Sequence, residues 1–70
     1  MDELTNLQSF GNKIKSFREK KNLTQAELAE MVGYSTNYVG MVERAERNTA
    51  VANVYKFARA LEVQPYEFFL

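Results

Sequence analysis

Residues 24–45, TQAELAEMVGYSTNYVGMVERA, decide the fold of this chain. Thr24 and Glu27 have the spacing of a capping box, in which each side chain accepts a hydrogen bond from the other residue's backbone N–H. Gly33 is the residue type that most readily adopts the left-handed conformation in which helices end. Ser35 follows after a single residue and is a second good N-cap. The stretch therefore predicts two short helices joined by a tight turn.

Two short helices joined by so tight a turn must cross steeply, which is the geometry of a helix-turn-helix. The small side chain of Ala29 allows close contact at the crossing. Apolar residues on both sides of the turn are expected to fill the corner between the helices: Leu28, Val32, Tyr34, Val39 and Val42. We therefore expect the helix-turn-helix motif to span about residues 24–45.

The outer face of the second helix of this motif suits the recognition of bases. Its outward positions are expected to be Thr36, Asn37, Gly40 and Met41. The residues at the start of such a helix enter the major groove first. An asparagine can pair bidentately with adenine, and a threonine can offer a hydroxyl or a methyl contact. Gln25, at the start of the preceding helix, is placed to reach a phosphate.

The rest of the chain also has helical periodicity. The first helix has apolar positions spaced by three and four, which are Leu4, Leu7, Phe10, Ile14 and Phe17. Because Gly11 weakens its early turns, this helix is expected to begin around Ser9 and to end near Lys21, with Asn22 as its stop.

Two further helices are expected after the motif. Asn48 or Thr49 is a candidate cap for a fourth helix, whose apolar positions are Val51, Val54, Phe57, Ala58 and Leu61. Pro65 suits the first position of a last helix. The prediction is a single all-α domain over residues 1–70, folded as a compact five-helix bundle.

The composition excludes several classes of site. The chain has no cysteine and no histidine, so it has no disulfide, no thiolate metal site and neither the commonest general base nor the commonest metal ligand. It has no glycine-rich phosphate loop and no paired carboxylates of an acid–base site. We therefore predict that the protein is not an enzyme and binds no metal or cofactor.

The hydropathy pattern predicts a cytoplasmic protein. No stretch approaches the roughly 20 apolar residues of a membrane span. The acidic residues 1–4 do not have the features of a signal peptide.

The charge balance is neutral, with nine basic and nine acidic residues, whereas nucleic-acid-binding domains are usually basic. The distribution is uneven, because five cations gather near the end of the first helix: Lys13, Lys15, Arg18, Lys20 and Lys21. An uneven distribution can still present a positive face to phosphates. On charge alone, ordinary solvated helix surfaces are the simpler interpretation.

Residues 24–33 and 38–44 together resemble the phage repressor and Cro-type (XRE) helix-turn-helix family, and the likeness extends over roughly residues 10–70. Residues 38–49, which include Glu43-Arg44 and Arg47-Asn48, also resemble the controller proteins of restriction–modification systems. Those are dimers of about this length that regulate their own operon. The resemblance implies a sequence-specific transcriptional regulator that binds double-stranded operator DNA, with the helix starting near Ser35 in the major groove.

The resemblance also implies roles for individual residues. Thr36, Asn37 and Met41 match positions of base contacts. Phosphate-contacting positions are matched by Gln25, Ser35, Tyr38, Arg44, Arg47 and Asn48, and the adjacent Thr24 is also expected to be a DNA-binding residue. Family members often pair an arginine at the position of Arg18 with a glutamate at that of Glu43, and this ion pair is expected to hold the first helix to the third.

The chain departs from the controller pattern at Thr36, where those proteins commonly have an arginine. Gly40 and Met41 are also poor hydrogen-bonding residues. We therefore expect fewer direct base contacts and a greater dependence on DNA shape.

The C-terminal residues 65–70 are unusually apolar for a chain end. They either fold back onto the core of the same chain or form a contact between two chains. We expect the second arrangement, a homodimer whose interface involves Tyr66, Phe68, Phe69 and Leu70.

A helix-turn-helix can also serve as a protein-binding module, for instance in an antitoxin or anti-repressor, because a fold does not fix a function. The zero net charge keeps this alternative open. A steep salt dependence and a preferred palindrome would favour the operator-binding hypothesis.

Overall fold

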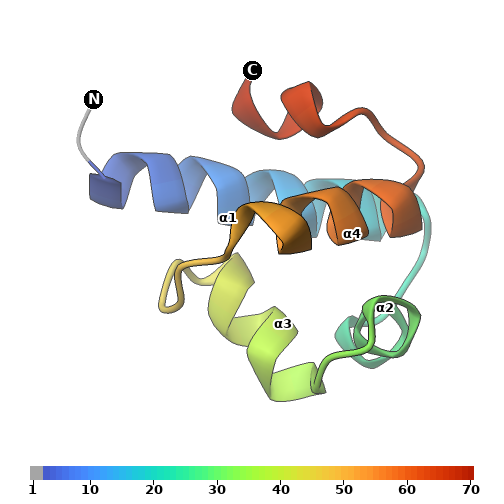
Figure 1. Ribbon diagram of the computed structural model, residues 1–70. Helices are drawn as coiled ribbons and strands as arrows, with labels where there is room; N and C mark the ends of the chain where they lie inside the picture. The colour runs from blue at the N-terminus through green and yellow to red at the C-terminus, as the bar shows by residue number, and fades with distance from the viewer. Residues whose placement is uncertain (1–2) are drawn as a thin grey trace.

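The computed structural model describes residues 3–70, with side chains from Leu7 onward, and its regular structure over that range is helical (Figure 1). The elements are α1 (Glu3–Lys20), α2 (Gln25–Val32), α3 (Thr36–Glu43), α4 (Val51–Leu61) and the 3₁₀ helix η1 (Pro65–Phe69). The predicted all-α class is confirmed, but the last helix is 3₁₀ rather than α. A segment of five residues is short enough for the tighter helix to satisfy its few backbone groups.

Helix α1 is longer than the sequence pattern predicts, because it begins at Glu3 rather than near Ser9. The side chain of Leu4 lies outside the described residues. Gly11 is buried where α1 crosses the end of α3. A Cβ atom at Gly11 would lie only 2.5 Å from the carbonyl oxygen of Val42 and 2.7 Å from that of Glu43. This glycine is therefore required by a close helix contact and does not mark the start of the helix.

The turn signals around α2 act as predicted. The Thr24 hydroxyl accepts a hydrogen bond from the Glu27 N–H at 3.0 Å, and the Glu27 carboxylate accepts one from the Thr24 N–H at 2.8 Å. Gly33 has a φ of 81°, the left-handed conformation that ends α2. Asn22, with a φ of 58°, makes the corresponding stop after α1. Ser35 caps α3 by accepting a hydrogen bond from the Tyr38 N–H at 3.1 Å.

The start of α4 differs from the prediction, because its N-cap is Ala50 and makes no side-chain cap. The two polar candidates have other partners. The Asn48 side-chain oxygen accepts the Thr49 N–H at 2.9 Å, and the Thr49 hydroxyl lies 3.0 Å from the Tyr38 hydroxyl. A local contact therefore uses the side chain of Asn48 and a tertiary contact uses that of Thr49, so neither caps the helix.

The core lies where all five elements meet, and its largest fully buried side chains are Phe57, Phe68, Ile14, Leu28, Val39 and Val42. η1 follows the end of α4 and lies along α1 (Figure 1). Phe68 of η1 meets the ring of Phe10 edge-on at 5.3 Å. Val51, one of the apolar positions expected on the fourth helix, is instead 72% exposed.

None of the described helices is both long enough and apolar enough to cross a membrane.

Candidate functional site

The exposed surface of α3 begins at its capped N-terminal end. Thr36 and Asn37 are exposed and Met41 is half-buried, whereas Val39 and Val42 on the opposite face are buried. The apolar face therefore fixes the helix to the domain, and the first turn is free to present polar side chains.

Gly40 is buried rather than outward-facing, which corrects the prediction for this position. A Cβ atom there would lie 2.9 Å from Arg44 Nη1 and 3.4 Å from Gln25 Oε1. The guanidinium of Arg44 thus lies back along α3, over the bare backbone of Gly40 and toward Gln25. The helical spacing of four residues, from 40 to 44, is what brings these two positions together.

A buried ion pair connects the first and third helices. Arg18 Nε donates to Glu43 Oε2 at 2.7 Å, and Arg18 Nη2 donates to Glu43 Oε1 at 3.2 Å. Arg18 Nη1 also donates to the Leu23 carbonyl at 2.8 Å. The hydrogen bond to Glu43 raises the pKa of Arg18, and burial opposes this shift only in part. The pair expected between Arg18 and Glu43 is present in the structure.

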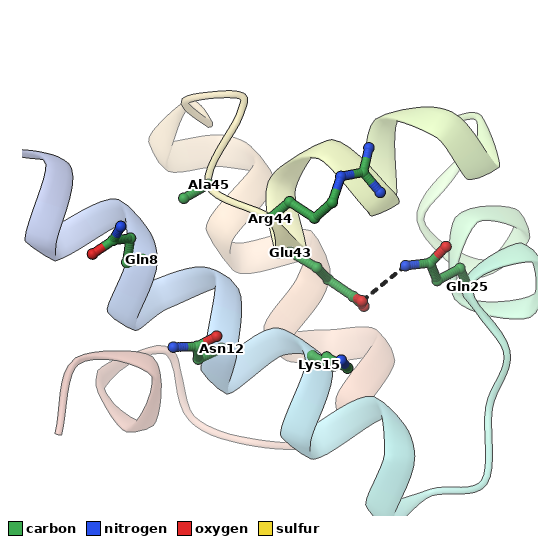
Figure 2. A pocket seen from close by; sticks show the side chains of 7 residues that line it. All are labelled: Gln8, Asn12, Lys15, Gln25, Glu43, Arg44 and Ala45. Atoms are coloured by element: carbon green, nitrogen blue, oxygen red, sulfur yellow. Dashed lines mark hydrogen bonds between the residues drawn. The ribbon is translucent and has the colours of Figure 1, made fainter.

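Gln25 joins the same network, as Figure 2 shows, because its Nε2 donates to Glu43 Oε1 at 3.0 Å. Its amide oxygen remains near Gly40 and Arg44. Glu43 therefore accepts hydrogen bonds from α1 and α2 while belonging to α3. The half-buried Gln25 side chain is held in one orientation at the start of α2, next to the exposed Thr24.

A second network of hydrogen bonds involves the two tyrosines of the motif, Tyr34 in the turn and Tyr38 in α3. The Tyr38 hydroxyl contacts Thr49 at 3.0 Å and accepts a hydrogen bond from Asn53 Nδ2 at 3.1 Å. The Tyr34 hydroxyl donates to the side-chain oxygen of Asn53, and Lys56 Nζ donates to the Tyr34 hydroxyl at 3.4 Å. This network connects the turn, α3, the following loop and α4.

Asn53 and Lys56 were not predicted as partners of the two tyrosines. The signal that could have found them is their spacing of three on α4, which places both side chains on one face of that helix. The two tyrosine rings pack with their centroids 4.8 Å apart.

The two arginines after α3 are exposed. Arg44 donates from Nε to Glu46 Oε2 at 3.1 Å and from Nη2 to Glu46 Oε1 at 3.2 Å, which raises its pKa. The guanidinium of Arg47 lies 5.9 Å from the centroid of the Tyr38 ring, within the range of a cation–π contact. Asn48, next to Arg47, is also exposed.

A cleft of about 570 Å³ lies beside the contact of α1 with the end of α3 and is called here the α1–α3 cleft. Its lining residues are Gln8, Asn12, Lys15, Gln25, Glu43, Arg44 and Ala45 (Figure 2). The three residues from α1 are exposed and spaced by four and three, so they form one stripe on that helix. This spacing is visible in the sequence, but only the packing of α1 against α3 shows that the stripe borders the motif.

The C-terminal aromatic residues divide between core and surface. Phe68 has no exposed surface, so it packs inside its own chain and leaves nothing for a partner to contact. This corrects its assignment to an interface. Tyr66, Phe69 and Leu70 are exposed at 63%, 63% and 77%. The Phe69 ring stacks on Phe10 with the centroids 5.8 Å apart, so it touches the core although most of its surface is exposed.

Comparison with known proteins agrees with this geometry. A family model described as "Helix-turn-helix" matches residues 14–68, which is more than half of the chain. Control protein C.SmaI of Serratia marcescens is 42% identical over 48 residues, which cover 69% of this chain and 57% of that protein. The matched stretch therefore spans less than two-thirds of the length of C.SmaI.

Solved structures give the same result over more of the chain. The restriction–modification controller protein C.AhdI from Aeromonas hydrophila superposes with a TM-score of 0.89 at 40% identity, covering 93% of this chain and 98% of that one. The P22 c2 repressor, solved in complex with a synthetic operator, superposes with a TM-score of 0.79 at 30% identity, covering 84% and 89%.

Proposed function

Because the chain belongs to the helix-turn-helix family of DNA-binding transcriptional regulators, and so to a family that is not enzymatic, we propose that it binds operator DNA as a homodimer with α3 in the major groove. The observation that carries this proposal is the rigid presentation of the first turn of α3. Thr36 and Asn37 are exposed on a helix whose start is capped by Ser35 and whose opposite face is buried.

Base contacts are assigned to Thr36, Asn37 and Met41. The amide of Asn37 can pair bidentately with adenine, and the side chains of Thr36 and Met41 can contact a thymine methyl group. Because Gly40 is buried and offers no side chain, the polar contacts of α3 are concentrated at its N-terminal end. That arrangement supports a recognition mode in which DNA shape supplements a small number of hydrogen bonds.

Phosphate contacts are assigned to residues on both sides of α3: Thr24, Gln25, Ser35, Tyr38, Arg44, Arg47 and Asn48. Gln25 and Tyr38 are each held by hydrogen bonds to other elements. Held side chains lose less conformational freedom when they bind a phosphate, which favours affinity. Arg44 and Arg47 add charge at exposed positions.

The dimer interface is assigned to Tyr66, Phe69 and Leu70. These three large apolar side chains are more than half exposed and lie within five residues of each other, next to the anchored Phe68. Two-fold pairing of such a patch would remove apolar surface from water. A dimer would carry two copies of α3, one for each half-site of an inverted repeat.

The test is selection of bound sequences from a random duplex library at moderate salt, followed by sedimentation of the selected complex. We expect an inverted repeat with half-sites about one helical turn apart and two chains on each site. Failure to enrich any sequence, with the protein folded, would contradict the proposal. Such a result together with tight binding to a protein partner would support the protein-binding alternative, with which the zero net charge is compatible.

A further inference from the structure

The α1–α3 cleft is positively charged in spite of the acidic residue that lines it. Lys15 and Arg44 each contribute one positive charge. The carboxylate of Glu43 is only 2% exposed, and both of its oxygens accept hydrogen bonds, including two from Arg18. The buried arginine compensates the buried glutamate, and Glu46 pairs with the exposed Arg44, so the net positive charge of the cleft comes from Lys15.

The other lining groups are suited to an anion. Gln8 and Asn12 add exposed side-chain amides, which can donate hydrogen bonds to oxygen atoms. Ala45 is the one apolar residue among the lining residues, and none of them is aromatic. The cleft thus offers nothing on which a base or an apolar ligand could stack. Phosphate oxygens, by contrast, match two cations and neutral donors.

The position of the cleft connects it to the DNA-binding surface. It includes Gln25 and Arg44, which flank α3, and it continues from them onto the exposed stripe of α1 (Figure 2). The approach of α1 that creates this continuity depends on the missing side chain of Gly11. A DNA strand that passes Gln25 can therefore extend along α1.

We propose that the α1–α3 cleft binds a phosphodiester group of the DNA backbone beyond the bases contacted by α3, with Lys15 as its counter-charge and Asn12 and Gln8 as hydrogen-bond donors. This proposal rests on the proposed function, because it adds a contact to the same complex. Arg44 is held by Glu46 in the free protein, but the pair is exposed and therefore weak enough for a phosphate to replace it.

The first experiment compares Lys15→Gln with the wild-type protein on a duplex that carries the selected operator and a helical turn of flanking DNA. Affinity is measured over a range of salt concentrations by fluorescence anisotropy. We expect the slope of log K against log salt to fall by about one per bound protomer, to a similar extent on the operator and on unrelated DNA. Lys20→Gln is the matched control, since Lys20 is an exposed lysine of the same helix outside the cleft.

The second experiment locates the phosphate. Neutral methylphosphonates replace the flanking phosphates one at a time, and affinity is measured for wild type, Lys15→Gln and Asn12→Ala. At one flanking position, neutralisation should weaken wild-type binding several-fold and should have little further effect on Lys15→Gln. Asn12→Ala tests the hydrogen bond without a change of charge and should weaken binding at the same position.

The outcomes separate this proposal from the function on which it rests. If the wild-type protein binds the operator but Lys15→Gln behaves like Lys20→Gln, with no flanking phosphate coupled to Lys15, the cleft does not contact DNA and the proposed function stands. If the wild-type protein binds no duplex, both proposals are wrong. Melting temperatures equal to wild type will show that the exposed substitutions leave the fold intact.

Discussion

Asn37 is an exposed side chain of α3 whose amide both donates and accepts hydrogen bonds. If it pairs with a base edge, Asn37→Ala should weaken operator binding by about 1–3 kcal/mol and relax the preference at one base position. Titrations against operators with single base changes will measure both effects. Affinity for unrelated DNA is the control and should hardly change. An unaltered base preference would show that Asn37 does not contact a base.

The pair of Arg18 and Glu43 is a residue-scale contact with consequences for three helices. Removing one partner leaves the other charge buried, so Arg18→Met should destabilise the domain by about 3–5 kcal/mol. The double variant Arg18→Met/Glu43→Leu should lose clearly less free energy of unfolding than the two single variants lose in sum, because it leaves no buried charge. Urea denaturation of the four proteins completes the cycle. Additive losses would show that the two side chains do not depend on each other.

The pH dependence of this pair has a definite sign. Folding raises the pKa of Arg18 through its hydrogen bond to Glu43, so protonation of Arg18 favours the folded state. That contribution is complete at every pH below the already very high pKa of an unfolded arginine, and it is lost only in stronger alkali. Arg18 should therefore add no pH dependence to the urea denaturation of the wild-type domain from about pH 6 to pH 9. A steep change within this range would point to a different titrating group.

At the scale of elements, the contact between α1 and α3 depends on Gly11. A Cβ atom at this position would collide with two carbonyl oxygens of the α3 backbone. These backbone atoms cannot rotate away, whereas the end of a flexible side chain could. This contact fixes the distance between the exposed stripe of α1 and the motif. It also lets Arg18 reach Glu43 from α1.

Gly11→Ala tests this contact, because alanine favours a helix by about 0.5–1 kcal/mol over glycine whereas overpacking costs about 1–3 kcal/mol. The net effect should be destabilising and visible as a lower melting temperature. Asn12→Ala, on the adjacent exposed position of the same helix, should be neutral or slightly stabilising. A melting temperature for Gly11→Ala equal to or above wild type would mean that the helices separate at little cost.

At the scale of the whole molecule, the C-terminal segment contributes one residue to the core and leaves its neighbours exposed at the surface. Phe68 completes the core, with ring contacts to Phe10 and Phe17 at 5.3 and 5.9 Å. Phe69 and Leu70 leave most of their surface outside it. The same short C-terminal segment therefore stabilises the core and leaves an apolar surface exposed.

Substitutions at these neighbouring positions should separate the two roles. Phe69→Glu should dissociate the proposed dimer with a modest effect on folding, since a charge would have to be buried in an apolar contact. Phe68→Ala should destabilise each chain by about 3–5 kcal/mol through loss of core packing. Sedimentation equilibrium and thermal melts measure the two effects. A Phe69→Glu variant that still sediments as a dimer would place the interface elsewhere.

Individual residues of the candidate site could be predicted from the sequence, but most of the contacts between its helices could not. The exposure of Thr36 and Asn37 follows from helical periodicity, and the pair of Arg18 with Glu43 was expected from resemblance. The burial of Gly40 was not, because a glycine has no side chain whose polarity could indicate a direction. Its surroundings depend on Arg44 and Gln25, and Gln25 lies on another helix.

The sequence by itself determined the helices whose ends are set by local chemistry. Thr24 with Glu27, Gly33 and Ser35 act through neighbours within a few residues, so their effect does not depend on the rest of the fold. Only the tertiary structure decided the use of side chains with several possible partners. Thr49 could cap α4 but contacts Tyr38, and Phe68 could face a partner but fills the core. Lys15 borders the motif because Gly11, which has no side chain, allows α1 to pack closely against α3. The physical reason is that such contacts join residues distant in sequence, whose proximity arises only when the helices pack.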